Sequence, residues 1–258
     1  MVLTTPSAIP ANVIWHDIEC GAYRADMPLW LELARAEAPA GTAARILDIG
    51  AGAGRVSLEL ARAGHNVSAL DLDGELLAAL AQRAGSAEIE ILQGDARAFA
   101  LQEREFALCI IPMQTIQLLG GAAGRLDFLR CARAHLRPGG LLACAIVTQL
   151  DVFDCREQIV GPSAETATVG GMSYISRAVR VAIGRTRIRI ERDRQILEAG
   201  HDPARASSAP ERDVIELDRL SAARLLREGR EAGLTAAGTR TIAATDEHVG
   251  GEVVLLRA

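Results

Sequence analysis

Lysine is absent from this sequence, and all 28 basic residues are arginine. The 33 acidic residues outnumber them and give a formal net charge of −5 at pH 7. A surface whose main task is to bind nucleic acid is strongly basic, so this balance argues against a nucleic-acid partner. Aromatic residues are also rare, at 3%, whereas hydrophobic residues reach 49%. The core of this 258-residue chain must therefore be mostly aliphatic.

Cysteine pairs, long apolar runs and metal-ligand clusters are missing too. The five cysteines form no C-x-x-C pair, which favours reduced core cysteines in a cytoplasmic protein. No apolar run approaches the roughly 20 residues of a membrane-spanning helix, and no signal-peptide pattern opens the chain. We therefore expect no membrane partner. Because no cluster of His, Asp and Glu has metal-ligand spacing, we also expect no bound metal.

The stretch Arg45-Ile-Leu-Asp-Ile-Gly-Ala-Gly-Ala-Gly-Arg55 predicts a strand, a glycine turn and a helix. Apolar residues at 46, 47 and 49 are typical of a buried strand, and helical spacing of apolar residues begins at Val56. A turn of this kind places free backbone N–H groups beside a ligand, at the positive end of the helix dipole. The stretch therefore predicts a ligand-binding turn.

Two classes of cofactor are consistent with a glycine turn of this kind. The NAD(P) fingerprint G-x-G-x-x-G needs glycine at position 55, where this chain has Arg55; the third glycine comes one place early, at Gly54. Asp48 stands two residues before the first glycine, and a carboxylate there suits a ligand with an amino group better than a pyrophosphate. Glycines that only permit close packing remain a further interpretation.

Three more motifs follow in order. Residues 66–71 predict a second strand that ends in Asp71, whose carboxylate offers two acceptors to the vicinal hydroxyls of a ribose. Residues 88–92 alternate like a strand and run into Gly94-Asp95-Ala96. Leu136-Arg-Pro-Gly-Gly140 precedes the apolar run 141–147.

Taken together, these motifs resemble those of the class I S-adenosylmethionine (SAM)-dependent methyltransferases. The resemblance implies a doubly wound, mostly parallel seven-stranded α/β sheet, in which Asp95 and Ala96 bind the adenine. The segment Tyr23-x-x-Asp26-x-Pro28-x-Trp30 is similar to a small-molecule branch, in which the tyrosine reaches the methionine end of SAM. The cofactor-binding residues expected for SAM, or for its product S-adenosylhomocysteine (SAH), are Tyr23, Asp48, Gly50, Ala51, Gly52, Gly54, Asp71, Leu72, Asp95, Ala96 and Ile111.

The order of the motifs and of the expected helices and strands divides the chain into four parts. Residues 1–42 form a mobile arm and lid helices, with Asp26 as a helix cap, and residues 43–150 form the SAM-binding core. Residues 151–218 form a β-rich cap, inserted before the last elements of the sheet, whose apolar residues alternate with arginines. We interpret those arginines as a solvated face whose charge is partly balanced by Glu191 and Asp193, rather than as an anion-binding surface. Residues 219–258 close the sheet with a helix and two strands.

The predicted function is methyl transfer to a small-molecule acceptor such as a secondary metabolite. The base-methylating Asn/Asp-Pro-Pro-aromatic motif is absent after the fourth strand. Transfer from a sulfonium is an in-line displacement that depends mainly on positioning, so catalytic residues are weakly specified. The alternatives are a SAM-binding scaffold or regulator without activity, and an NAD(P)-dependent oxidoreductase. We expect a monomer or homodimer. The catalytic candidates are His16, Glu19 and Gln114.

Overall fold

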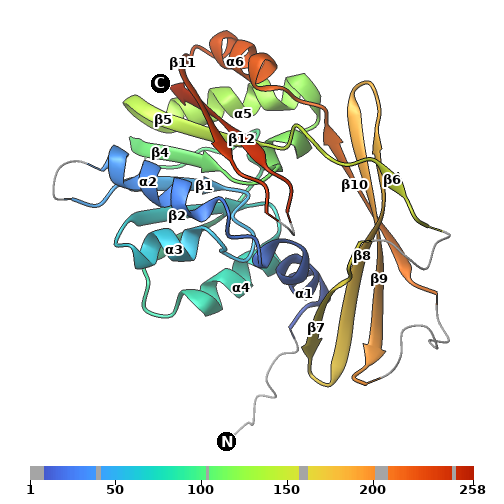
Figure 1. Ribbon diagram of the computed structural model, residues 1–258. Coiled ribbons are helices and arrows are strands. Elements are labelled where there is room, and N and C mark those ends of the chain that lie inside the picture. The colour runs from blue at the N-terminus through green and yellow to red at the C-terminus, as the bar shows by residue number, and fades with distance from the viewer. Residues whose placement is uncertain (1–8, 39–41, 103–104, 157–161, 201–208, 246–247) are drawn as a thin grey trace, which may run out of the picture.

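A computed structural model describes residues 9–38, 42–102, 105–156, 162–200, 209–245 and 248–258 (Figure 1). Its larger sheet has seven strands in the order β11-β12-β5-β4-β1-β2-β3. β1 to β5 run parallel, whereas β12 is antiparallel to both of its neighbours. The strands are β1 Arg45–Ile49, β2 Asn66–Asp71, β3 Ile89–Gln93, β4 Phe106–Ile111, β5 Leu136–Ile146, β11 Thr235–Ile242 and β12 Gly251–Arg257. This arrangement confirms the predicted fold class.

Helices cover both faces of this sheet because neighbouring strand residues point to opposite sides. Ile46 packs with Trp30 and Leu60 on one face, and Leu47 packs with Phe128 on the other. The first face carries α2 Met27–Glu37, α3 Ser57–Arg62 and α4 Gly74–Ala84; the second carries α5 Gly121–His135 and α6 Ala222–Glu231. The sheet is therefore doubly wound, and its carboxyl edge is free for a ligand.

A second, antiparallel sheet stands beside the core as a cap (Figure 1). Its order is β10-β9-β8-β6, with β7 paired to β8. The arginines of its polar face are balanced within the sheet: Arg180, Arg189 and Arg212 all donate to the Glu191 carboxylate and hold its pKa at about 2. The strands are β6 Phe153–Asp154, β7 Glu165–Val169, β8 Met172–Ile183, β9 Arg187–Glu198 and β10 Glu211–Asp218.

The N-terminal segment, α1 Ala11–His16 and the π-helical turn η1 Asp17–Gly21, lies between core and cap (Figure 1). On the core side, Asn12 donates to the helix-capping Asp73 at 3.0 Å, and Arg83 donates to Asp17 at 2.6 and 2.8 Å. On the cap side, Arg194 donates to Glu19 at 2.7 and 2.8 Å. This segment therefore connects the two sheets. Residues 1–8 of the predicted mobile arm lie outside the described residues.

Two local predictions need correction. Asp26 precedes α2 but makes no capping hydrogen bond; it accepts instead from the Trp30 indole at 2.8 Å and from Arg55. The Pro-Gly-Gly turn lies inside β5 rather than before it. The turn fits there because Gly139 takes a left-handed φ of 73° and the pairing register with β4 shifts between Phe106 and Leu108.

Candidate active site

The glycine turn after β1 brings other elements close to the backbone. Gly50 and Gly52 have left-handed φ angles of 69° and 54°, which favour glycine. A Cβ at Gly50 would overlap Thr115, and one at Gly52 would overlap the imidazole of His16. Gly54 packs against Leu80 of α4 instead. Glycine at the first two positions therefore lets Thr115 and His16 approach the turn, whereas the third glycine permits helix packing.

The acid at the end of β2 is held in place by the glycine turn. The Gly52 N–H donates to Asp71 Oδ2 at 2.7 Å, and the Asp73 N–H donates to Oδ1 at 2.9 Å. A carboxylate has about four acceptor positions, so Asp71 can still accept from two hydroxyl groups. This fixed carboxylate marks one wall of the site.

Asp48 is buried below the same turn. Ser57 donates to its Oδ2 at 2.6 Å, whereas Oδ1 is buried without a hydrogen-bond partner in the part of the chain that the structure describes. Burial raises the pKa of Asp48 to about 7. A buried carboxylate with one unmatched oxygen suits a cationic donor such as an ammonium group.

Asp95 follows β3 on the exposed side of the site. Its carboxylate accepts from the Arg97 side chain at 2.6 to 3.1 Å and from the Arg97 N–H at 2.9 Å. These bonds lower its pKa to about 2, so it is ionised at neutral pH. Asp95 can receive a ligand donor, but it shares its oxygens with Arg97.

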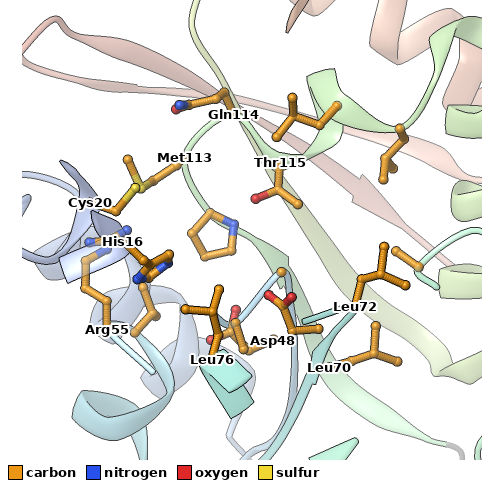
Figure 2. A pocket seen from close by; sticks show the side chains of 18 of the residues that line it. His16, Cys20, Asp48, Arg55, Leu70, Leu72, Leu76, Met113, Gln114 and Thr115 are labelled. Atoms are coloured by element: carbon orange, nitrogen blue, oxygen red, sulfur yellow. The ribbon is translucent and has the colours of Figure 1, made fainter. Parts of the chain in front are cut away.

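These groups surround the first cavity, a space of ≈ 440 Å³ at the carboxyl edge of the sheet (Figure 2). His16, Cys20 and Arg55 stand on one side of it, and Leu70 and Leu72 on the other. The predicted cofactor residues that line it are Asp48, Gly50, Ala51, Asp71, Leu72, Asp95 and Ala96. The fold therefore brings together groups that are far apart in the sequence.

A second cavity of ≈ 310 Å³ adjoins the first and opens between core and cap. Met113 and Gln114, which follow β4, line both cavities. Met113 has a φ of 56°, an uncommon left-handed conformation for a residue with a side chain. This strained turn lies at the junction of the two cavities.

Gln114 is thus the one catalytic candidate of the three that reaches both spaces. His16 lines the first cavity but not the second; burial lowers its pKa, and its Nδ1 has no partner among the described atoms. Glu19 lines the second cavity, but Arg194 and Ser176 bind its carboxylate and lower its pKa. These positions argue against His16 and Glu19 as bases that act on an acceptor.

Four expected cofactor residues do not line the first cavity. Ile111 is fully buried within the sheet, Gly54 is covered by Leu80, and Gly52 is covered by the imidazole of His16. Tyr23 lines the second cavity rather than the first. Its ring packs under the Arg55 guanidinium at 5.2 Å, and Arg55 also donates to the Tyr23 carbonyl at 2.9 Å. Arg55, the residue that disfavours an NAD(P) fingerprint, therefore holds Tyr23 at the border between the cavities.

Comparisons with known proteins agree with this geometry. Residues 46–140 match a family model described as a methyltransferase domain. A search of curated proteins finds no match. This match covers less than half of the chain, from β1 to the glycines within β5.

Solved structures resemble the whole chain and not only this domain. The amino pentose methyltransferase CalS10 from Micromonospora echinaspora, solved with SAM bound, is 19% identical with a TM-score of 0.68, covering 99% of this chain and 100% of that one. The sugar N-methyltransferase KedS8 from Streptoalloteichus is 15% identical with a TM-score of 0.70, covering 98% and 96%. DesVI from Streptomyces venezuelae is 20% identical with a TM-score of 0.66, covering 95% and 97%. At such identities the likeness shows a shared fold.

The residues around the first cavity fit the SAM that a methyltransferase domain uses. Asp48 offers an unmatched buried oxygen to the ammonium group, and Asp71 has acceptors left for the ribose. Gly50 and Ala51 of the glycine turn line the cavity. Among the described residues, no group of three His, Cys, Asp or Glu could hold a metal ion, and no helix there is long and apolar enough to cross a membrane.

The sequence patterns do not predict one residue of the second cavity, His248. His248 lies in the connection between β11 and β12, lines the second cavity, and packs on Tyr23 with ring centroids 5.0 Å apart. The surrounding residues Glu252 to Leu256 predict only a closing strand. No local motif points to this histidine, since its position depends on the pairing of the last two strands with the core sheet.

Proposed function

We propose that this protein is a SAM-dependent methyltransferase that acts on a small molecule bearing an amine. The junction of the two cavities at Met113 and Gln114 is the observation that supports this proposal. SAM in the first cavity would supply an electrophilic methyl group, and the second cavity would hold the acceptor. The enzyme's contribution is then to align the two molecules and exclude water.

The proteins of similar fold favour an amine as the acceptor. The carboxylates that line the second cavity, Glu19, Asp26 and Glu165, are each paired with an arginine, so their charges do not select the acceptor. The proteins of similar fold that are described as an amino pentose methyltransferase, a sugar N-methyltransferase and a glycopeptide N-methyltransferase act on nitrogen-bearing acceptors.

The parts of the chain have separate tasks in this proposal. Residues 43–150 bind SAM, residues 1–42 close over it, residues 151–218 select the acceptor, and residues 219–258 complete the core sheet. The support is that the first cavity is lined almost wholly by core residues, whereas the second includes residues from β8, β9 and β10.

Ligand binding and methyl transfer test this function in turn. At a ligand concentration of about one hundred times Kd, SAM or SAH should stabilise the protein by about 2.7 kcal/mol and raise Tm by roughly 5–10 °C. NADH should leave Tm unchanged. Isotope-labelled SAM, incubated with amino sugars, should then transfer its methyl group.

The two readouts separate the alternatives. A Tm shift with NADH and none with SAM or SAH would support an oxidoreductase. SAM binding without transfer to any amine or hydroxyl compound would support a scaffold or regulator. Transfer to the amine-bearing compounds but not to their hydroxyl counterparts supports the proposal.

A further inference from the structure

We propose that His248 is the proton acceptor in this reaction: it takes a proton from the ammonium group of the acceptor before methyl transfer. The inference rests on the proposed function and adds a catalytic residue to it. An ammonium nitrogen has no lone pair, so an amine that is protonated at neutral pH must lose a proton to become a nucleophile.

The backbone holds His248 in place within its connection. The Thr245 N–H donates to the His248 carbonyl at 2.8 Å, and the His248 N–H donates to Thr245 Oγ1 at 3.0 Å. The residue is half-buried and lines the second cavity. The imidazole can therefore contact an acceptor on one side and exchange its proton with solvent through the exposed part of the connection.

His248 lies close to the border between the two cavities. The Tyr23 ring lies 5.0 Å from the imidazole, and the guanidinium carbon of Arg55 lies 5.2 Å from the same tyrosine ring. Arg55 lines the first cavity, and His248 lines the second. One aromatic ring thus separates the imidazole from the wall of the first cavity.

The other titratable groups on this cavity are poor proton acceptors. Arg194 binds Glu19, Arg55 binds Asp26, and Arg192 binds Glu165 at 2.8 Å. A carboxylate paired with a guanidinium is a weak base. Tyr23 carries its proton, since burial raises the pKa of its phenol. Asp246 and Glu247, which precede His248, lie outside the described residues.

Imidazole suits the task because the neutral ring has one nitrogen with a free lone pair that can accept a proton. The ammonium group gives one proton to His248, which becomes imidazolium. The freed lone pair of the nitrogen forms a bond to the methyl carbon while the bond from that carbon to sulfur breaks, and its electron pair stays on sulfur. The products are SAH and a methylated ammonium, and the imidazolium returns its proton to water.

The test compares His248→Gln with Val249→Ala, a neighbour that lines the same cavity but cannot titrate. D-glucosamine, D-galactosamine and kanosamine serve as amine probes, with D-glucose as the hydroxyl probe. SAH affinity is measured by calorimetry, and SAH release is measured between about pH 6 and 9. His248→Asn serves as a second variant should His248→Gln fail to fold.

We expect His248→Gln to keep the wild-type affinity for SAH and to lose about a hundredfold or more of kcat/KM at pH 7. Its activity should recover as pH rises, because the amine then loses its proton to water. Imidazole added to the solution should restore part of the activity of His248→Ala. Val249→Ala should keep the wild-type pH profile.

Failure of the inference differs from failure of the proposed function. A wild-type protein that methylates an amine, together with an equally active His248→Gln across the pH range, overturns the role of His248. Methylation of D-glucose alone also overturns it. A wild-type protein that binds no SAM, or transfers no methyl group to any probe, contradicts the proposed function itself, and the inference falls with it.

Discussion

Three carboxylates near the ends of neighbouring strands have very different surroundings although they border one cavity. Asp95 accepts from Arg97 and has a pKa of about 2, whereas Asp48 is buried and has a pKa of about 7. Asp71 is fixed by two backbone N–H groups. The environment of each carboxylate, rather than its residue type, therefore decides which part of a ligand it can bind.

Asp71→Ala should weaken SAH binding about tenfold or more. The substitution removes the acceptors for two ribose hydroxyls, and hydrogen bonds to a charged acceptor are worth about 1.5–3 kcal/mol. Asp71→Asn should lose less, because one carbonyl oxygen remains. Calorimetry with SAH measures both variants. Unchanged affinity in a correctly folded Asp71→Ala protein would refute the assignment.

Asp48 should make SAM binding depend on pH. Its folded-state pKa is raised from 3.8 to about 7, so the SAM-free protein loses stability as pH rises between these values. An ammonium ligand prefers the ionised carboxylate, so affinity should rise with pH up to about 7 and then level off. Calorimetry at several pH values measures the trend.

Asp48→Asn provides the matched comparison for this titration. The variant cannot ionise, so its affinity for SAM should stay flat between about pH 5.5 and 7 and should be weaker than that of the wild type at pH 7. Its Tm without ligand should be higher than that of the wild type at pH 8, because the buried charge is gone. A lower Tm would show that Asp48 is not a buried, destabilising carboxylate.

At the scale of elements, the N-terminal segment is fastened to both sheets by arginine–carboxylate pairs. Arg83 holds Asp17 to the core, and Arg194 holds Glu19 to the cap. The Arg55–Asp26 pair, with side chains 7% and 0% exposed, ties the start of α2 to the glycine turn. The N-terminal segment itself has one ion pair on each side, so it can open if either pair is released.

We expect SAM or SAH to slow proteolysis within residues 13–26. The ligand would fill the first cavity beneath this segment and add contacts to His16 and Arg55, which line it. Glu19→Gln should speed cleavage without ligand, because the charge that pairs with Arg194 is lost. Limited digestion followed by mass spectrometry locates the cuts. Equal cleavage rates with and without ligand would indicate a static helix rather than a lid.

At the scale of the whole molecule, core and cap meet around the second cavity. Arg125, which is 1% exposed, bridges Glu228 of α6 and Asp218 at the end of β10. Gln117 exchanges hydrogen bonds with Val147 and donates to the Asp218 carbonyl. These buried contacts fix the point where the cap returns to the core sheet, so the cap stands in a defined position over the site.

Two cap arginines should separate acceptor binding from cofactor binding. Arg192 lines the second cavity, so Arg192→Ala should change KM for the acceptor several-fold and leave SAH affinity unchanged. Arg189 pairs with Glu191 and Glu216 on the polar face, so Arg189→Ala should alter neither value. Kinetics with an amino sugar and calorimetry with SAH provide the readouts. Loss of SAH binding in either folded variant would contradict the division between core and cap.

The sequence by itself determined the core fold and the carboxylates of the first cavity. The positions of Gly50, Asp71 and Asp95 could be predicted because each lies at or just after the end of a strand, and the carboxyl ends of parallel strands meet at one edge. Local patterns also predicted the cap hairpin, since its apolar residues alternate along both strands.

Only the tertiary structure decided which side chains are available to a ligand or as a proton acceptor. Glu19 looked available in the sequence, but an arginine 175 positions away neutralises it. Arg55 holds Tyr23 at the second cavity, and the pairing of β11 and β12 brings His248 to the same cavity. Long-range ion pairs and strand pairing leave no local pattern, because they join residues that only the folded chain brings together.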